Sequence, residues 1–203
     1  MKRKMMIIGL TGSIGMGKST GAKMLKKRGL PVYNADQAVH AALKKNGAAV
    51  GKIAKLFPET LQKGAIDKKK LAAIVFADPK ALRQIEKILH PLAEKAEKAF
   101  LAEARREGKK AVLLEIPLLF ETGAEKRCDV TICLTAAAKI QKARVLARPA
   151  MTEARFKAIR KRQMSESEKK KRATFIVNTG KNLADTERQL YQIWNKIQEM
   201  NNA

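Results

Sequence analysis

The chain of 203 residues is 45% hydrophobic and carries 43 lysines and arginines against 19 aspartates and glutamates, a formal net charge of +24. This length suits one α/β domain with an insertion or one core with a small satellite, and no apolar run approaches the roughly 18 residues of a membrane-spanning helix. The positive charge would attract polyanions, nucleotides and nucleic acid alike, but only 4% of the residues are aromatic, too few for a base-stacking surface. We therefore expect a basic, solvated exterior that does not serve nucleic-acid binding.

The first predicted strand leads into a glycine-rich loop. Residues 5–10 form a short apolar run typical of a buried parallel strand, and residues 12–19 read Gly-Ser-Ile-Gly-Met-Gly-Lys-Ser. This segment fits the pattern G-x-x-x-x-G-K-[ST], and a helix is predicted over residues 19–28, ended by Gly29. A glycine-rich loop that matched the motif by chance would not be expected to lie between a predicted strand and a predicted helix. The pattern therefore indicates a P-loop that binds a nucleotide.

The chemistry of such a loop assigns roles to its residues. Successive backbone N–H groups of a curled glycine loop point at an anion, and the dipole of the following helix faces the same concavity. Lys18 can reach the β- and γ-phosphates, and the Ser19 hydroxyl can ligate Mg²⁺. The residues predicted to contact ATP are Gly12, Ser13, Ile14, Gly15, Met16, Gly17, Lys18, Ser19 and Thr20.

A second buried strand is predicted over residues 30–36, and it ends in the polar sequence Asn34-Ala35-Asp36. Ligands of open α/β sheets gather at the carboxyl ends of strands. A carboxylate at Asp36 could accept the proton of a hydroxyl that attacks a γ-phosphate. The alternative is that Asp36 caps a helix beginning at Gln37, and one carboxylate could do both.

Residues 41–108 change character and are predicted to be almost entirely helical. Helices are expected over residues 48–57 and 69–77, and another begins at Pro79. Leu89-His90-Pro91 is expected to break this helix, which restarts and runs to Arg106, and no strand is predicted. The segment is interpreted as a helical insertion that binds a second substrate; crossover helices packed on the sheet are the alternative for part of it.

Two further strands are predicted over residues 110–121 and 128–134. Glu115 lies where P-loop enzymes place an acidic residue near Mg²⁺, although a purely structural carboxylate is an equal alternative. The cysteines, Cys128 and Cys133, have neither zinc-ligand spacing nor the framework of a disulfide-rich protein. Two reduced core thiols and a cytoplasmic protein are therefore expected.

The rest of the chain is a basic helical segment followed by a last strand and helix. Arg144 and Arg148 lie four residues apart on one helical face, and arginines placed here could neutralise charge on a transferring phosphoryl group; surface solvation is the alternative. A strand over residues 174–177, a turn at Asn178-Thr179-Gly180 and an amphipathic helix over residues 183–200 complete the pattern.

In this order, the motifs resemble the dephospho-coenzyme A kinase family over essentially the whole chain. The resemblance rests on residues 9–12 leading into the loop, Asn34-Ala35-Asp36 with His40, Val75-Phe76, Leu89-His90-Pro91, residues 116–121 (Ile-Pro-Leu-Leu-Phe-Glu), Arg144 with Arg148, Gln163, and Asn178 with Gly180. It implies an enzyme that phosphorylates the ribose 3′-hydroxyl of dephospho-coenzyme A, using ATP and Mg²⁺ and giving coenzyme A and ADP.

The resemblance also implies a fold and an organisation. The expected fold is α/β: a three-layer P-loop parallel sheet with helices on both faces, an α-helical substrate-binding insertion and a helical lid. The core would comprise residues 1–40, 109–140 and 173–203, the coenzyme-binding region residues 41–108 and the lid residues 141–172. ATP and dephospho-coenzyme A are the expected partners, without a membrane, for a monomer or weak oligomer.

On this mapping the site residues fall into four groups. The catalytic residues would be Asp36, Lys18, Arg144 and Arg148, and Asn178 would lie near the adenine of ATP. The acceptor would be bound by Asp36, His40, Lys70, His90 and Glu121. The metal would be held by Ser19 and Glu115. A P-loop kinase acting on a nucleoside or nucleoside monophosphate is the first alternative, and a basic nucleic-acid-binding NTPase is the second.

Three stretches of the sequence depart from the family pattern. Asn34 stands where the family usually has Asp, Arg148-Pro149-Ala150 replaces Arg-Asp-Gly, and Val177-Asn178 replaces Asp-Asn. If Asp36 is the base, the first change leaves catalysis intact, whereas the second is expected to stiffen the turn after Arg148.

Overall fold

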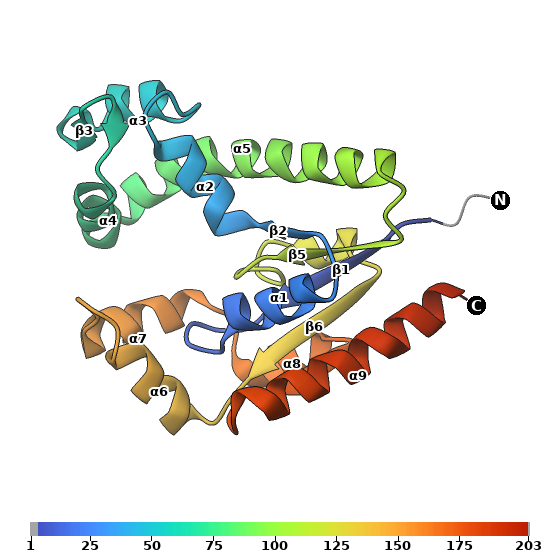
Figure 1. Ribbon diagram of the computed structural model, residues 1–203. Helices are drawn as coiled ribbons and strands as arrows, with labels where there is room; N and C mark the ends of the chain where they lie inside the picture. Colours follow the sequence, from blue (N-terminus) through green and yellow to red (C-terminus); the bar gives the residue numbers. More distant parts are fainter. Residues whose placement is uncertain (1–3, 203) are drawn as a thin grey trace. The chain divides into compact units, whose positions relative to one another are not determined.

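The computed structural model describes residues 4–202; residues 1–3 and 203, which the predicted core includes, lie outside the described residues. The helices and strands are β1 Met6–Thr11, α1 Lys18–Lys27, β2 Val32–Asn34, α2 Ala35–Leu43, α3 Val50–Leu56, β3 Leu61–Gln62, β4 Ala65–Ile66, α4 Lys68–Ala77, α5 Pro79–Arg106, β5 Ala111–Glu115, β6 Val130–Thr135, α6 Ala138–Leu146, α7 Glu153–Arg162, α8 Glu166–Arg172, β7 Phe175–Asn178 and α9 Leu183–Asn202 (Figure 1). Short 3₁₀ helices occupy Pro58–Thr60 and Ala124–Arg127.

The chain divides into two compact units. One, called the sheet unit here, consists of residues 4–33 and 104–202, and the other, called the helical unit, consists of residues 34–103. Each unit has an apolar core of its own, so each can be described by itself.

The sheet unit is built around a five-stranded sheet with the order β2-β5-β1-β6-β7. The central strand β1 pairs in parallel with both β5 and β6, so that Ile8 lies opposite Leu113 on one side and Val130 on the other. Strands of a parallel sheet are covered on both faces and are therefore apolar throughout, which explains why every residue of β5 and β6 is buried. The predicted parallel α/β sheet is confirmed.

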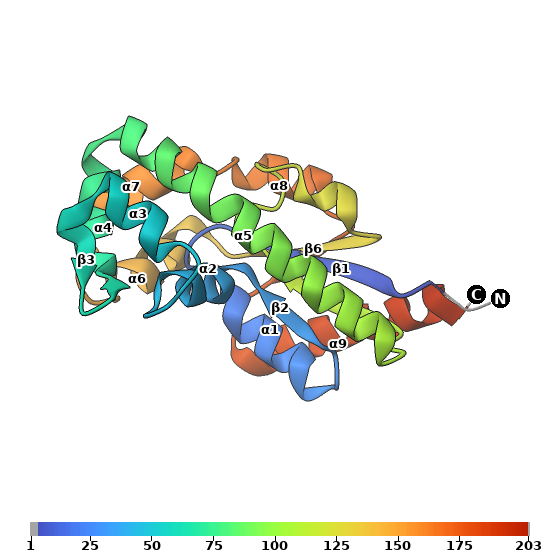
Figure 2. The same cartoon turned by 90° about the horizontal axis from the view of Figure 1, so that it is seen from above.

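Helices cover both faces of this sheet. Side chains alternate along a strand, and Ile132 and Leu134 of β6 join a core to which α1 contributes Leu25 and α9 contributes Leu190. The two helices α1 and α9 contact each other and lie side by side in both views (Figure 1, Figure 2). Helix α8 also contacts β6, and the buried Cys133 between Ile132 and Leu134 points away from the α1–α9 core.

Three predicted strands differ from the structure by two residues or more. The strand predicted over residues 30–36 is β2, Val32–Asn34, because α2 begins at Ala35. The apolar run over residues 110–121 is a strand only as far as Glu115, because Pro117 follows and residues 117–123 turn. The strand predicted to start at Cys128 begins at Val130. An apolar run in the sequence can extend beyond the residues that pair with a neighbouring strand. The apolar pattern alone therefore overestimates the length of the strand.

The helical unit contains a small hairpin, and the prediction of no strand there was wrong. Strands β3 and β4 pair in antiparallel fashion, with Leu61 opposite Ile66. The turn between them consists of Lys63 and Gly64, whose φ angles are 49° and 80°, and two positive φ angles are typical of tight two-residue hairpin turns. Each strand has only two residues, too few for an alternating pattern to be recognised.

The predicted break at Pro91 is also wrong, since α5 runs without interruption from Pro79 to Arg106 with Pro91 inside it. Proline removes one backbone donor and crowds the preceding turn. Around it, however, Ile88, Leu89 and Leu92 pack against the core of the helical unit. One continuous apolar face therefore offsets the lost hydrogen bond. Among the described helices, none combines the length and apolar character of a membrane-spanning segment.

Candidate active site

The P-loop lies between β1 and α1, as the sequence predicted, and its glycines are required by the geometry. Gly12 and Gly15 have φ angles of 146° and 80°, which side chains rarely allow. A Cβ at Gly12 would approach the carbonyl oxygen of Leu134 to 2.5 Å, and one at Gly15 would meet Val145 Cγ2 at 2.6 Å. The loop can therefore curl against β6 and α6 only because these positions lack side chains.

Lys18 and Ser19 open α1 at the inner end of this loop. The Lys18 ammonium donates to the carbonyl oxygens of Gly12 at 2.7 Å and Ser13 at 3.3 Å, so it lies across the loop. The Ser19 hydroxyl donates to Glu115 Oε1 at 2.8 Å. Glu115 is the last residue of β5 and only 4% exposed. The two residues predicted to hold a metal are thus in contact.

The donor set at this point fits Mg²⁺. A hydroxyl and a carboxylate are hard oxygen ligands, and Mg²⁺ is usually held by one or two such groups together with substrate phosphates. Within residues 4–202 no cluster of three or more histidine, cysteine, aspartate and glutamate side chains could hold a metal ion. An ion at Ser19 and Glu115 would therefore need the nucleotide to complete its coordination.

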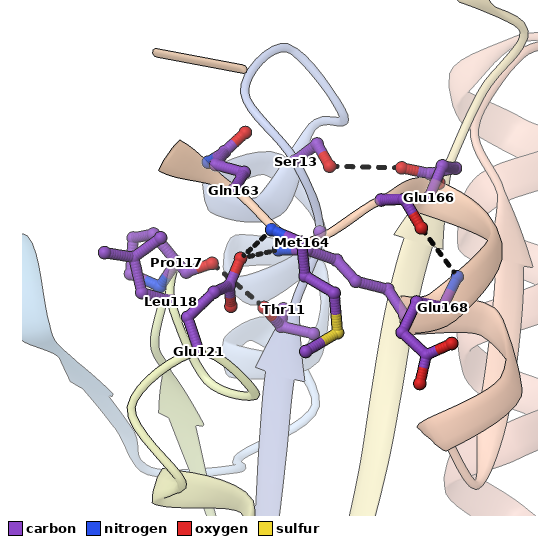
Figure 3. Close-up of polar contacts among 12 residues, drawn as sticks. Thr11, Ser13, Pro117, Leu118, Glu121, Gln163, Met164, Glu166 and Glu168 are labelled. Carbon is purple, nitrogen blue, oxygen red and sulfur yellow. Dashed lines mark hydrogen bonds and ion pairs between the residues drawn. The ribbon is translucent and has the colours of Figure 1, made fainter. Parts of the chain in front are cut away.

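Three side chains from other segments, those of Gln141, Gln163 and Glu166, hold the outer part of the P-loop. The backbone of Ile14 is bonded on both sides: its carbonyl oxygen accepts from Gln141 Nε2 at 2.8 Å, and its N–H donates to Gln163 Oε1 at 3.0 Å. The Ser13 hydroxyl donates to Glu166 Oε2 at 3.1 Å (Figure 3). Gln163 appeared only in the family pattern, and no spacing signal marks Gln141 or Glu166.

A cavity of about 700 Å³ opens beside the P-loop in the sheet unit. Gly15, Gly17 and Thr20 line one part of it, and Arg144 and Arg148 line another. The structure therefore brings the two predicted arginines together with the phosphate-binding loop. Positive side chains beside such a loop suit a polyphosphate.

The turn after β7 lines the same cavity and orients Arg144. The guanidinium of Arg144 donates to the hydroxyl of Thr179 at 3.0 Å and to its carbonyl oxygen at 2.6 Å. Thr179 in turn donates to the carbonyl oxygen of Met16 in the P-loop at 3.3 Å. Thr179 is thus a site residue that the sequence marked only as part of a turn.

Asn178, predicted to lie near the adenine, shapes this turn. Its side-chain oxygen accepts from the N–H of Gly180 at 2.8 Å, and its backbone exchanges hydrogen bonds with Gln189 of α9. The lining of the cavity here comes from the residues that follow, among them Lys181 and Leu183. Leu183 is 66% exposed, an apolar surface of the kind that a base could cover.

Glu121, predicted to bind the acceptor, is engaged within the sheet unit. Its Oε1 accepts from the N–H of Met164 at 2.8 Å and lies 2.8 Å from the ammonium of Lys169 (Figure 3). The Lys169 side chain is fully buried. Lysines are almost never fully buried unless they are paired. The sequence analysis, which expected a basic and solvated exterior, therefore did not predict a buried lysine at this position.

Burial also decides the chemistry of Cys133. Loss of solvent, together with the nearby Glu166 carboxylate, raises the pKa of its thiol to about 11. A neutral, fully buried thiol is a poor nucleophile, as expected of a core cysteine. Cys128 is a half-buried thiol that lies before β6.

In the helical unit, the residue that caps α2 is Asn34 and not Asp36. Asn34 Oδ1 accepts from the N–H of Gln37 at 2.7 Å, and Asp36 lies in the first turn of the helix. The alternative in which Asp36 caps a helix starting at Gln37 is wrong, because the helix begins two residues earlier. Asparagine and aspartate cap equally well, so the departure at position 34 preserves the helix start.

The other residues predicted to bind the acceptor are exposed. His40 lines a cavity of about 580 Å³ in the helical unit together with Lys44 and Lys68, and Lys70 and His90 lie on the surfaces of α4 and α5. Asp67 caps α4, and hydrogen bonds from the N–H groups of Lys70 and Lys69 hold the pKa of its carboxyl below the usual value. This cap fixes the start of the basic segment formed by residues 68–70.

A parallel sheet with a P-loop between its central strand and first helix, and arginines on a cavity beside that loop, define a P-loop kinase. The chain belongs to the dephospho-CoA kinase family, whose model matches residues 6–185. A dephospho-CoA kinase from Brucella melitensis is 46% identical over 189 residues, which cover 93% of this chain and 94% of that protein. One from Paramagnetospirillum magneticum is 49% identical over 166 residues, 82% of this chain and 78% of the relative.

Solved structures agree with this assignment. A crystal structure of a protein from Thermus thermophilus matches with a TM-score of 0.80 and 36% identity, covering 96% of this chain and 98% of that one. A dephospho-CoA kinase from Campylobacter jejuni matches with a TM-score of 0.72 and 26% identity over the same shares. Shikimate kinase from Acinetobacter baumannii, with a TM-score of 0.53, 16% identity and coverage of 97% and 95%, shares the fold alone.

Proposed function

We propose that this chain transfers the γ-phosphoryl group of ATP to the ribose 3′-hydroxyl of dephospho-CoA, giving CoA and ADP. The observation that carries the proposal is the P-loop itself, in which Lys18 spans the loop and Ser19 contacts the buried Glu115, in a chain of the dephospho-CoA kinase family. ATP is the phosphoryl donor of a kinase with this loop, and the family name supplies the acceptor.

The sheet unit would manage the phosphates. Lys18 would neutralise the β- and γ-phosphates, and Arg144 and Arg148, which line the cavity beside the loop, would stabilise charge on the transferring group. Ser19 and Glu115 would hold Mg²⁺, which when bound supplies charge neutralisation across the phosphates. The turn from Asn178 onward would hold the adenine.

The helical unit would supply the acceptor side. Asp36, exposed in the first turn of α2, is the proposed base that accepts the proton of the ribose hydroxyl. His40, Lys70 and His90 would bind the coenzyme, whose pyrophosphate suits basic side chains. Glu121 of the sheet unit is also a proposed acceptor-binding residue. Residues 41–108 form the proposed coenzyme-binding region, residues 141–172 the lid, and a monomeric or weakly associating enzyme of the cytoplasm is proposed.

An ADP-release assay tests the function. The chain is incubated with ATP and Mg²⁺, with and without dephospho-CoA, and the product is identified by mass. Acceptor-dependent ADP formation with CoA as product is the expected result. ADP formation with a nucleoside or nucleoside monophosphate, and none with dephospho-CoA, would overturn the proposed acceptor.

A further inference from the structure

The connection between α7 and α8 and the first residue of α8, together residues 163–166, contact the outer end of the P-loop and are called the junction here. Gln163 Oε1 accepts from the N–H of Ile14 at 3.0 Å, and Glu166 Oε2 accepts from the Ser13 hydroxyl at 3.1 Å. Figure 3 shows Ser13 pointing toward Glu166, with Gln163 on the other side of Ser13 in this view. Ser13 is only 6% exposed, so solvent does not replace this contact readily.

A buried ion pair between Glu121 and Lys169 holds the backbone of the junction in place. Glu121 Oε1 accepts from the N–H of Met164 at 2.8 Å and pairs with Lys169 Nζ at the same distance. The Lys169 side chain has no exposed surface, and apart from this ion pair its ammonium has no hydrogen-bond partner within residues 4–202. A buried charge whose single counter-ion is removed is strongly destabilised, so Glu121 is the group on which the placement of α8 depends.

The contacts of the junction fall on the part of the P-loop whose neighbouring residues have the greatest backbone freedom. Ser13 and Ile14 lie between two glycines that both have positive φ, and glycine is the residue with the greatest backbone freedom. A loop that must be ordered by its ligand loses binding free energy to conformational entropy, whereas one held in the bound geometry does not. Side chains that fix Ser13 and Ile14 therefore act on nucleotide affinity without touching the nucleotide.

We propose that Gln163 and Glu166 are positioning residues that hold Ser13 and Ile14 in the geometry that binds the nucleotide's phosphates, and that the Lys169–Glu121 ion pair keeps the junction in place. The inference rests on the proposed function in one respect, that the loop binds ATP. It does not depend on which acceptor receives the phosphoryl group.

The first test compares Gln163→Met with Gln198→Met, which changes an exposed glutamine of α9. Titration calorimetry measures the affinity of the full chain for ATP with Mg²⁺ and without acceptor. The expected result is a dissociation constant raised about three- to tenfold for Gln163→Met, as for the loss of one hydrogen bond, and unchanged for Gln198→Met. In turnover, KM for ATP should rise by the same factor while kcat stays within about twofold.

The second test separates the hydrogen bond of Glu166 from its charge. Glu166→Ala removes the acceptor of the Ser13 hydroxyl and should weaken ATP binding several-fold, whereas Glu166→Gln keeps an acceptor oxygen and should bind ATP at least as tightly as the unmodified chain. Equal losses in both variants would overturn the role of the hydrogen bond. Unchanged ATP affinity in Gln163→Met and Glu166→Ala, with lowered thermal stability, would show that the junction is merely structural.

The third test is a double-mutant cycle on the anchor. Glu121→Gln and Lys169→Met should each lower thermal stability and weaken ATP binding, because each leaves one buried charge unpaired. The double variant should recover both properties relative to the single ones. Recovery of stability without recovery of ATP affinity would mean that one of these charges acts on the nucleotide directly, and would overturn the proposed anchoring.

The measurements keep the two proposals apart. A chain that binds ATP but does not phosphorylate dephospho-CoA refutes the proposed acceptor, while the ATP affinities of the variants still decide the role of the junction. A chain that binds no ATP refutes the positioning role as well.

Discussion

The two units of this protein differ in how they hold most of their site residues. In the sheet unit, Lys18, Ser19 and Arg144 are each held by hydrogen bonds to neighbouring groups. In the helical unit, the residues predicted to act on the acceptor lie exposed on helices, and their side chains form no hydrogen bond or ion pair with any residue in the described range: Asp36, His40, Lys70 and His90.

This difference suggests how the two substrates are bound. A phosphate cradle made of backbone N–H groups works only if the loop is already curled, and surrounding side chains supply that order before the nucleotide arrives. Long exposed side chains on helices can instead be ordered by the ligand, at a cost in affinity. Apart from Glu121, which is proposed to bind the acceptor, changes in the sheet unit should therefore act on ATP. Changes in the helical unit should act on the acceptor or on the proton transfer.

The largest expected effect is that of Asp36→Asn. Loss of the proposed base should lower kcat about 10³-fold while the dissociation constant of ATP stays within about twofold, because Asp36 belongs to the helical unit. Asp78→Asn is a matched control: its side chain accepts from the N–H of Lys80, which asparagine also does. A rate for Asp36→Asn within tenfold of the unmodified enzyme would remove Asp36 as the base.

Glu115→Gln should have the next largest effect. The amide oxygen can still accept from the Ser19 hydroxyl, but the negative charge that would attract Mg²⁺ is lost. We expect about 10- to 100-fold lower activity at limiting Mg²⁺, partly recovered at high Mg²⁺, as measured by ADP release over a magnesium titration. An unchanged magnesium dependence would assign Glu115 a purely structural role.

The core of the sheet unit should make stability depend on pH. Burial raises the pKa of the Cys133 thiol from its ordinary value of 9.0 to about 11, so its contribution to stability is complete below pH 9 and is lost as the pH rises through 11. The free energy of unfolding should fall by up to about 1.4 kcal/mol per pH unit in this window. Urea unfolding of Cys133→Ala should lack this part of the decrease.

His40→Ala and His90→Ala test the acceptor side of the comparison. Each should raise KM for dephospho-CoA about three- to tenfold, the loss expected for one polar contact, and leave ATP affinity unchanged. Initial-rate measurements with each substrate varied in turn provide the check. A histidine variant that altered only KM for ATP would contradict the division of labour between the units.

The smallest effect is expected at Ala150, one of the departures from the family pattern. Its φ of 58° is unfavourable for alanine and free for glycine, and its carbonyl oxygen accepts from Arg155 at 2.8 Å. Ala150→Gly should relieve this strain, less the entropy that glycine adds to the unfolded chain. A gain of about 0.5 kcal/mol in the free energy of unfolding is expected from thermal and urea unfolding, whereas a loss would show that the turn is unstrained.

Much of the candidate site could be predicted because it lies within short stretches of sequence or follows from parallel strand order. The strand, loop and helix of the P-loop are contiguous in sequence, and the glycines of the loop indicate positions with a backbone conformation that other residues rarely adopt. The contact between Ser19 and Glu115 was also foreseeable, since β1 and β5 are adjacent parallel strands and their carboxyl ends meet at one edge of the sheet.

The rest depends on packing between distant segments. The predicted break at Pro91 failed because an apolar face shared by both halves of α5 outweighs one missing hydrogen bond. The hairpin at residues 61–66 was too short to leave a pattern. Gln141, Glu166 and Thr179 reach the P-loop from segments more than 120 residues away in sequence, and no local pattern encodes such a contact.

By itself, the sequence determined the class of fold, the nucleotide-binding loop and the family, because these follow from the spacing of residues within short motifs and from the order of the motifs along the chain. Only the tertiary structure decided that Lys169 is buried against Glu121 and that the junction holds Ser13 and Ile14. A lysine in a basic helix looks the same in sequence whether it is solvated or buried. Its environment is set by what folds over it, in this case by α8 against β6 and the turn that carries Glu121.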